Sequence, residues 1–137
     1  MFKHILVPID LSDRNRRTLR TALELARQSR ARVTLLHVIQ SVEKLRPGEL
    51  RGFYQKLTAV SSRKLDRAAK PFAGRIRVRT EVCVGEPARE IIRVSLRDRV
   101  ALIVMGSHMV RPGRAARWGT TSYKVGIFCQ CPILLVK

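Results

Sequence analysis

The sequence is short of three kinds of residue, and each shortage narrows what the chain can do. It has 10 Asp and Glu against 28 Lys and Arg, 3 cysteines, and an aromatic content of 5%. Three cysteines in a chain that enters a strand pattern directly, with no signal peptide, predict reduced thiols and a cytoplasmic location. Few aromatic side chains leave little for base stacking, so we expect no specific recognition of nucleic acid.

The sequence also lacks long apolar runs, internal repeats and low-complexity tracts. No run approaches the roughly 18 apolar residues that span a bilayer, so no membrane insertion is expected. Apolar residues make up 45% of the chain, which is typical of a globular protein. At 137 residues and without a linker, the chain is predicted to form one domain over residues 1–137.

What the sequence has in excess is positive charge. The formal net charge is +18, and such a field attracts polyanions of any kind, from nucleotides to nucleic acid and anionic lipid. Solvated basic faces explain the same composition without a polyanionic partner. Because charge by itself reports on solubility and nonspecific binding, we favour the solvated faces and keep polyanion binding as an alternative.

Apolar patterning predicts a sheet whose strands alternate with helices. Continuous apolar runs predict buried strands at residues 4–9 and 101–106, and further strands are predicted at 32–39 and 132–137. Residues 75–84 instead alternate, which predicts an edge strand that is wet on one face. Helices are expected within 10–30, 49–73, 85–98 and 121–130, with a loop over 40–50. This alternation is typical of a parallel sheet with helices on both faces and right-handed crossovers.

Parallel sheets of this kind bind ligands beyond the carboxyl ends of their strands. Asp10 after the first strand, Val38 at the end of the second and the segment after Gly106 are therefore candidates. The carboxylate of Asp10 can accept hydrogen bonds from a ribose or cap the first helix. Ser12 or Asp13 can supply that cap instead, so we favour the ligand role for Asp10.

The segment "VMGSHMVRPGRAARWGTT" (104–121) has the features of a phosphate-binding loop. Its end, Gly119-Thr120, opens a predicted helix whose free N–H groups and dipole attract phosphate. Thr120 adds a hydroxyl and Thr121 a further N–H group. Three arginines of the segment can pair with phosphate oxygens or act as plain surface charge: Arg111, Arg114 and Arg117.

Signals for catalysis are weak. Ser107 and His108 are neighbours in sequence, which rarely face each other, and no G-x-S-x-G elbow surrounds them. Asp10 has neither a second carboxylate for general acid–base work nor the neighbouring acidic pair that holds magnesium. Cys129 and Cys131 have no further ligands at metal spacing, so no zinc site is expected. We therefore expect no enzymatic activity and leave only slow ATP hydrolysis open.

Five segments, in order and at the right separations, resemble the universal stress protein family. They cover essentially the whole chain: "ILVPIDLS", "VTLLHVI", "GEPAREII", "LIVMGSH" and "CPILLVK". The resemblance implies a Rossmann-like α/β fold with a five-stranded parallel sheet in the order 3-2-1-4-5. It also implies a homodimer formed through the last strand (Pro132 to Val136). Val38 would meet an adenine ring, with plain core packing as the alternative.

The family's nucleotide-binding branch carries the motif Gly-x2-Gly-x9-Gly-[Ser/Thr], which this chain resembles with one change. Gly106, Gly119 and Thr120 match, whereas Met109 stands at the second glycine. If that position needs a positive φ, methionine costs about 1 to 2 kcal/mol, which weakens nucleotide binding by about tenfold. Because a methionine side chain is flexible, we expect it to swing aside, and we expect Met109→Gly to tighten ATP binding.

The resemblance thus implies a stress-response protein that binds an adenine nucleotide, ATP with Mg²⁺ in particular, as a regulatory ligand. A nucleotide-free dimeric interaction module of the same family is the first alternative, and a basic polyanion-binding protein is the second. The expected binding residues come from strand ends and from the phosphate-loop segment: Pro8, Asp10, Val38, Met105, Gly106, His108, Met109, Arg111, Gly119, Thr120 and Thr121.

Overall fold

Five parallel strands form one sheet at the centre of the fold. The computed structural model describes residues 1–41, 47–107 and 120–137. The strand order is β3-β2-β1-β4-β5, so β3 and β5 are the two edges and the predicted order is confirmed. The strands are β1 (His4–Pro8), β2 (Arg32–Gln40), β3 (Val78–Gly85), β4 (Leu102–Gly106) and β5 (Ile133–Val136).

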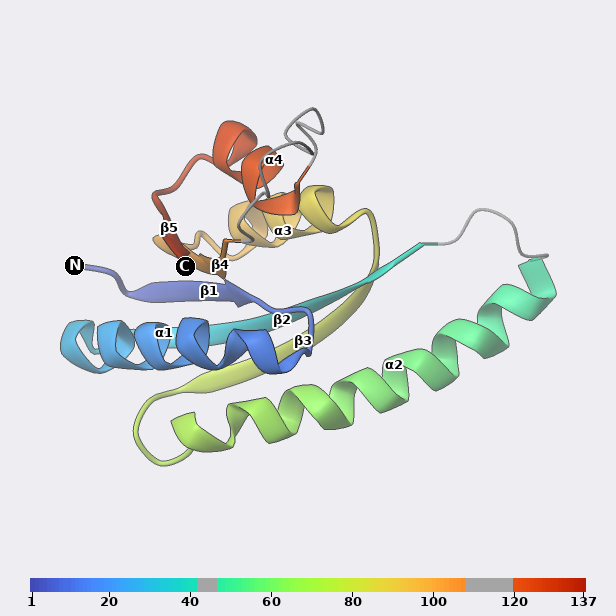
Figure 1. Cartoon of the computed structure of the whole chain (residues 1–137), viewed down its shortest axis with the longest axis horizontal. Helices are drawn as coiled ribbons and strands as arrows, with labels where there is room; N and C mark the ends of the chain where they lie inside the picture. The colour runs from blue at the N-terminus through green and yellow to red at the C-terminus, as the bar shows by residue number, and fades with distance from the viewer. Residues whose placement is uncertain (42–46, 108–119) are drawn as a thin grey trace.

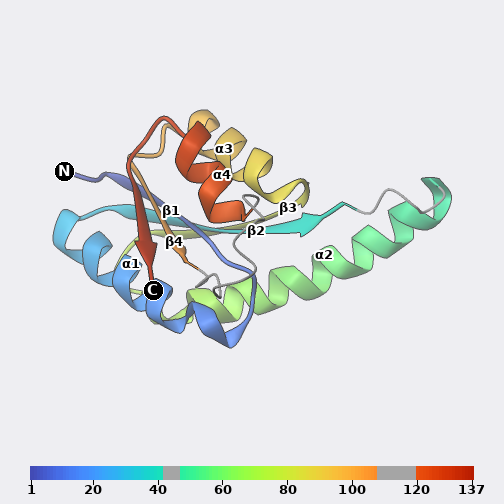
Figure 2. The same cartoon turned by 45° about the horizontal axis from the view of Figure 1, so that its top comes forward.

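Helices cover both faces of the sheet, as the alternating pattern predicts (Figure 1). One face is covered by α1 (Arg16–Ser29) and α2 (Pro47–Ala69). The other face is covered by α3 (Pro87–Arg97) and α4 (Thr121–Phe128). Figure 2 shows α3 and α4 lying side by side above the sheet, where they contact each other.

The central strands supply both hydrophobic cores because their successive side chains point to opposite faces. Ile5 and Val7 of β1 pack toward α1 and α2, whereas Leu6 packs toward α3 and α4. In β4, Val104 and Ile103 divide in the same way. Burial on both sides explains why these strands appear in the sequence as continuous apolar runs.

The first helix begins later than its sequence pattern indicates. A single 3-10 turn, η1 (Asp13–Asn15), precedes α1, which starts at Arg16. The residue before α1 is Asn15, and neither it nor Ser12 caps with its side chain. The predicted cap by Ser12 or Asp13 is therefore wrong. Asp10 holds this turn instead, because its carboxylate can reach several donors of the turn at once.

The predicted loop over residues 40–50 contains more regular structure than expected. β2 continues to Gln40, and α2 begins at Pro47. Proline fits the first turn of a helix because its φ is already helical and no N–H is left unpaired there. The loop prediction is therefore wrong for residues 47–50. α2 is 23 residues long, yet among the described residues no helix, α2 included, is long and apolar enough to cross a membrane.

The strand β3 lies at the sheet edge as predicted, but its polar face is only partly wet. Its apolar face packs on the core formed with α1 and α2. On the polar face, Glu81 pairs with Arg97, and Arg79 pairs with Asp98, at the end of α3. Cys83, further along the same face, is half-buried against the core formed with α3 and α4. The end of α3 thus covers part of a face that the alternating pattern assigns to solvent.

Candidate functional site

The candidate site lies at the carboxyl ends of β1 and β4, where the strand order reverses. A cavity of about 480 Å³ opens there between the strand ends and the first turns of α3 and α4. Its volume falls within the range of roughly 300–1,000 Å³ that is usual for small-ligand sites. Connections that leave neighbouring strands toward opposite faces produce such a crevice. The location is the one that the sequence predicts.

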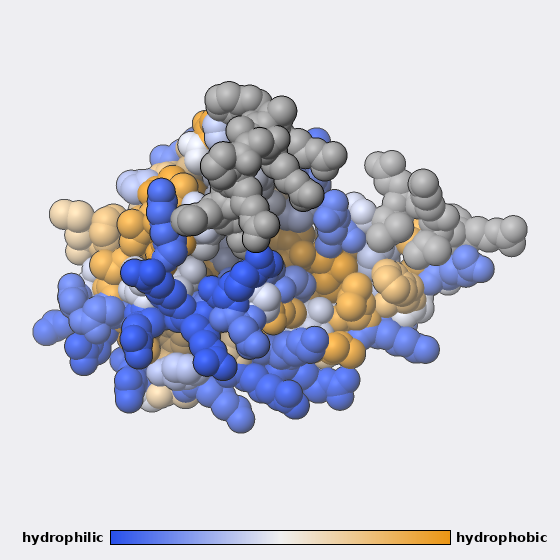
Figure 3. Space-filling view, in the orientation of Figure 1, coloured by the Kyte–Doolittle hydropathy of each residue, from blue (hydrophilic) through white to orange (hydrophobic). Residues whose placement is uncertain are grey.

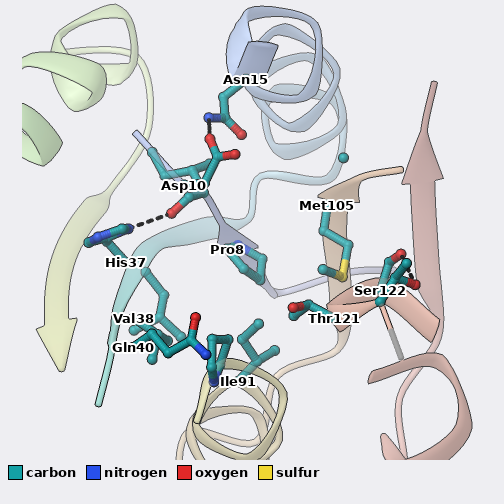
Figure 4. Close-up of a pocket in the computed structure, with 15 residues that line it drawn as sticks. Pro8, Asp10, Asn15, His37, Val38, Gln40, Ile91, Met105, Thr121 and Ser122 are labelled. Carbon is teal, nitrogen blue, oxygen red and sulfur yellow. Dashed lines mark hydrogen bonds between the residues drawn. The ribbon is translucent and has the colours of Figure 1, made fainter. Parts of the chain in front are cut away.

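Apolar side chains form the middle of the cavity, and polar groups stand at its ends. Pro8 lies at the centre of Figure 4, with Asp10 and Asn15 on one side and Thr121 and Ser122 on another. The apolar walls come from four different elements: Pro8, Val38, Ile91 and Met105. Apolar walls with a few convergent polar groups suit a flat ring system that carries polar substituents.

Asp10 organises the turn between β1 and α1. Its Oδ1 accepts hydrogen bonds from the N–H of Ser12 (3.0 Å), the hydroxyl of Ser12 (2.6 Å) and the side-chain amide of Asn15 (2.5 Å). Its Oδ2 lies 3.5 Å from a guanidinium nitrogen of Arg14. The carboxylate thus shapes the start of α1 with one oxygen while it lines the cavity. The structural and the ligand interpretations of Asp10 are therefore compatible.

The charge of Asp10 follows from these contacts. Burial raises the pKa of Asp10, but the hydrogen bonds from Ser12 and Asn15 and the charge of Arg14 outweigh burial and lower the pKa to about 2. The group is therefore a carboxylate at neutral pH. Its Oδ2, which forms a long ion pair with Arg14, is the oxygen best placed to accept a donor from a ligand.

His37 also lines the cavity, although no pattern in the sequence pointed to it. Its Nδ1 lies 2.8 Å from the carbonyl oxygen of Ile9. Because a carbonyl only accepts, Nδ1 is the donor of this hydrogen bond. Gln40, another lining residue, was missed because it follows the apolar run. Both flank Val38 at the carboxyl end of β2, and that position is the signal that could have found them.

The amino end of α4 faces the cavity from the other side. Thr120 is the N-cap, and its hydroxyl oxygen accepts from the N–H of Tyr123 at 3.3 Å. The N–H groups of Thr121 and Ser122 lie in the first turn, where a helix has no internal acceptor for them. These groups and the helix dipole can therefore meet an anion. The predicted helix start at Thr120 is confirmed, with a capping role that the sequence did not reveal.

Gly106 ends β4 and lines the cavity, but its backbone is ordinary. Among the described glycines, Gly74 has the positive φ, and Gly106 does not. A Cβ at position 106 would lie 3.3 Å from Oγ1 of Thr18 on α1. The backbone of Gly106 therefore does not itself require glycine. Glycine is favoured here because α1 packs closely against the end of the strand.

The structure brings together every predicted site residue that it describes. Four of the predicted residues, His108, Met109, Arg111 and Gly119, lie outside the described residues. The others line the one crevice although they come from distant parts of the chain: Pro8, Asp10, Val38, Met105, Gly106, Thr120 and Thr121. Their convergence agrees with a common binding site, while the individual contacts to a nucleotide stay predictions.

Comparisons with known proteins agree with this fold. A family model described as the universal stress protein family matches residues 1–137. The universal stress protein YxiE of Bacillus subtilis is 31% identical over 152 aligned residues, which cover 100% of both chains. A universal stress protein of Thermus aquaticus is also 31% identical, over 144 aligned residues and 100% of both chains.

Solved structures show the same architecture. The hypothetical protein MJ0577 is 29% identical with a TM-score of 0.80, over 100% of this chain and 96% of that chain. A universal stress protein in complex with cAMP has a TM-score of 0.73 at 20% identity, over 99% and 97% of the two chains. The universal stress protein of Archaeoglobus fulgidus in complex with dAMP has a TM-score of 0.66 at 22% identity, over 99% and 98%. The chain belongs to the universal stress protein family.

Proposed function

We propose that this chain binds an adenine nucleotide, ATP in particular, in the crevice between β1 and β4, and that the nucleotide acts as a regulatory ligand. The observation that carries the proposal is the apolar slot that separates the Asp10 turn from the amino end of α4. Two proteins of the same fold, solved with cAMP and with dAMP, hold adenine nucleotides. The proposal extends that ligand class to this chain.

Each part of the cavity suits one part of such a ligand. Val38 and Ile91 would flank the adenine ring, since both belong to the apolar walls. Oδ2 of Asp10 would accept a hydrogen bond from a ribose hydroxyl. The N–H groups of Thr121 and Ser122 would meet a phosphate oxygen at the positive end of the α4 dipole.

Magnesium would enter this site together with the phosphates of ATP. The ion usually takes one or two carboxylates and fills its remaining positions with phosphate oxygens and water. Within the described ranges, no group of three or more His, Cys, Asp or Glu side chains could hold a metal ion. Asp10 lines the cavity as a carboxylate. Because its pKa is about 2, it is a poor proton acceptor at neutral pH, which supports binding without turnover.

Two measurements test the proposal. The purified protein is denatured and its supernatant is analysed for nucleotide, and the emptied protein is then titrated calorimetrically with ATP, AMP and GTP, with and without Mg²⁺. We expect ATP to bind more tightly than GTP, which carries the same phosphates on a different base. No co-purified nucleotide together with no heat at millimolar ATP would refute the proposal.

We also propose that the chain forms a homodimer through the free edge of β5. Leu134 and Leu135 of this strand are 38% and 40% exposed, and Phe128 at the end of α4 is 67% exposed. An apolar edge strand invites pairing with another strand, and a second copy would cover these side chains. Light scattering should show a dimer that Leu134→Asp converts to a monomer. A monomeric wild type would refute the dimer, and a dimer without nucleotide would favour the interaction-module alternative.

A further inference from the structure

A second concave surface lies at the opposite edge of the sheet, where the strands begin. Two hollows, of about 630 and 380 Å³, share five lining residues and therefore adjoin, and we treat them as one groove. We call it the amino-edge groove. Its lining comes from the starts of β1, β2 and β3 and from the ends of α1 and α3. The shared residues are His4, Arg32, Arg77, Asp98 and Arg99.

Most of the basic side chains in this groove form no ion pair with an acidic side chain that the structure describes. The acidic residue of its lining, Asp98, is already engaged by Arg79 and Arg97. Arg27 is paired with Glu24. Six exposed cations of the lining make no ion pair with any acidic side chain that the structure describes: Lys3, Arg30, Arg32, Arg75, Arg77 and Arg99.

The strand register aligns Arg32 with Arg77 where β2 and β3 begin, and Lys3 lies one residue out of register before β1. The N–H of Arg32 donates to the carbonyl oxygen of Lys3 at 3.0 Å, and the N–H of Val33 donates to that of Arg77 at 2.8 Å. Lys3, Arg32 and Arg77 therefore stand at the beginnings of three neighbouring strands. Like charges across neighbouring strands destabilise a sheet, and a bound anion would remove that repulsion.

Two of the six cations have a structural explanation. Arg30 and Arg99 lie just beyond the ends of α1 and α3, where a cation interacts favourably with the helix dipole. Both have a left-handed backbone, with φ of 53° and 49°, at positions where glycine is the usual residue. The dipole accounts for these two, while Arg32, Arg75 and Arg77 gain nothing comparable from the fold.

The lining indicates which polyanion the groove would accept. Guanidinium groups match phosphate oxygens with two parallel hydrogen bonds. Ala31, Ile76 and Ala101 add an apolar floor that can carry sugars and bases, which a bare phosphate chain would not need. No Phe, Tyr or Trp belongs to the described lining, so bases would not stack and their identity would not be read. A concave surface without exposed large apolar side chains also differs from a lipid-binding face.

We propose that the amino-edge groove binds single-stranded nucleic acid through its phosphate backbone, without regard to sequence. Figure 3 shows hydrophilic side chains at the end of the molecule where β2 begins and also along the side covered by α1 and α2. This end is opposite to the crevice, because all five strands are parallel and the crevice lies at their carboxyl ends. The proposal therefore does not rest on nucleotide binding.

A triple substitution and a charge-matched control test the groove. The test variant carries Arg32→Gln, Arg75→Gln and Arg77→Gln, and the control carries Arg51→Gln, Lys56→Gln and Arg63→Gln on exposed positions of α2. Binding of a labelled strand of about 12 nucleotides is followed by fluorescence anisotropy at several salt concentrations. The test variant should bind about tenfold or more weakly, and the slope of log K against log salt should become shallower by about 2. The control should stay within about twofold of wild type.

The outcomes separate the groove from other sources of binding. Thermal unfolding should show the test variant at least as stable as wild type, since repulsion is removed, and a collapse of its fold would overturn that reasoning. Equal losses in test and control variants would show that net charge alone binds the strand. Displacement of the strand by ATP would place it in the crevice. Inorganic polyphosphate or phosphatidylserine vesicles could also bind through the same three arginines and outcompete the strand. That result would make polyphosphate or lipid the ligand of the groove. Equal losses in both variants, displacement by ATP, and competition by polyphosphate or vesicles would each overturn the proposal.

Discussion

The two ends of the sheet offer anions two different kinds of site. The crevice at the carboxyl ends has apolar walls and the amino end of α4, whereas the amino-edge groove has six cations that pair with no acidic side chain of the described ranges. The reason lies in the direction of the chain. Strands end by leading into helix amino ends, which present N–H groups, and they begin after helix carboxyl ends, which present carbonyls. A site at the beginning of the strands can therefore attract phosphate only through charged side chains.

The largest expected effect comes from filling the crevice. Val38→Trp places an indole in the cavity that Val38 lines, so nucleotide affinity should fall by about 100-fold, or about 2.7 kcal/mol. Strand binding in the amino-edge groove should be unchanged. Val84→Trp, on an exposed position of β3 outside the cavity lining, is the matched control. Calorimetry and anisotropy on one preparation check both sites, and a loss of both would show that the two ends are coupled.

Asp10 should matter next, for stability as well as for binding. Asp10→Ala removes the acceptor for Ser12 and Asn15, so the free energy of unfolding should fall by about 1 to 2 kcal/mol. Asp10→Asn keeps an oxygen for these donors and should lower the free energy of unfolding by less. It should still weaken nucleotide binding, because an amide nitrogen replaces Oδ2. Urea unfolding and calorimetry measure the two effects. Equal destabilisation by both substitutions would contradict the assigned turn role.

Gly106→Ala should cost about 1 kcal/mol of stability, because the new methyl group would press on Thr18 of α1 at 3.3 Å. Gly126→Ala provides the contrast, since nothing lies within 4 Å of a Cβ there. Gly126 lies within α4, so alanine should raise stability by about 0.5 to 1 kcal/mol. Thermal unfolding of the two variants gives the comparison. Two shifts of the same sign would remove the close-packing explanation for Gly106.

The smallest expected effect is a difference in how the two ends respond to acid. Burial, followed by the charge of Arg32, lowers the pKa of His4, whose Nε2 lies 2.8 Å from Oγ1 of Thr34. The hydrogen bond to the Asp98 carbonyl and the Asp98 charge act against this shift, and the charge of Arg79 adds to it. The unfolded chain then takes up a proton below about 6.5 more readily than the folded protein, so stability falls as the pH drops through that value.

Asp10 affects stability in the same direction at the other end, but at a lower pH. Its pKa is lowered from 3.8 to about 2, so its contribution is complete above about 3.8 and is lost as the pH falls toward 2. Mild acid should therefore weaken the amino edge first. Urea unfolding at about pH 7.5 and 5.5 should show a smaller change in His4→Gln, which keeps a partner for Thr34, than in wild type. An identical pH dependence would contradict the role of His4.

Sequence reasoning located correctly the elements whose residue pattern is compatible with only one structure. A run such as residues 4–9 can only be buried on both faces, and it became β1. Sequence reasoning was wrong where a local pattern is compatible with more than one structure. Pro47 can open a helix as readily as a loop, and Ser12 or Asp13 can cap a helix as readily as Asp10 can hold its first turn.

Part of the crevice was predictable, and part of it was not. Asp10, Val38 and Gly106 stand at strand ends, where position alone marks a ligand site. Asn15, Ile91 and Ser122 line the same cavity, but they arrive through the packing of three different helices. No local pattern distinguishes Ile91 from other apolar residues of α3, because its role depends on the neighbour that it faces.

The sequence by itself determined the sheet order through its family resemblance, the residues that follow each strand, and the net charge of +18. The tertiary structure decided where that charge is compensated. Arg79 and Arg97 found acidic partners across β3 and α3, whereas Arg32, Arg75 and Arg77 found none among the described residues. Composition counts charges, but only the packing of distant segments decides which of them meet, because an ion pair depends on distance in space and not on separation in the chain.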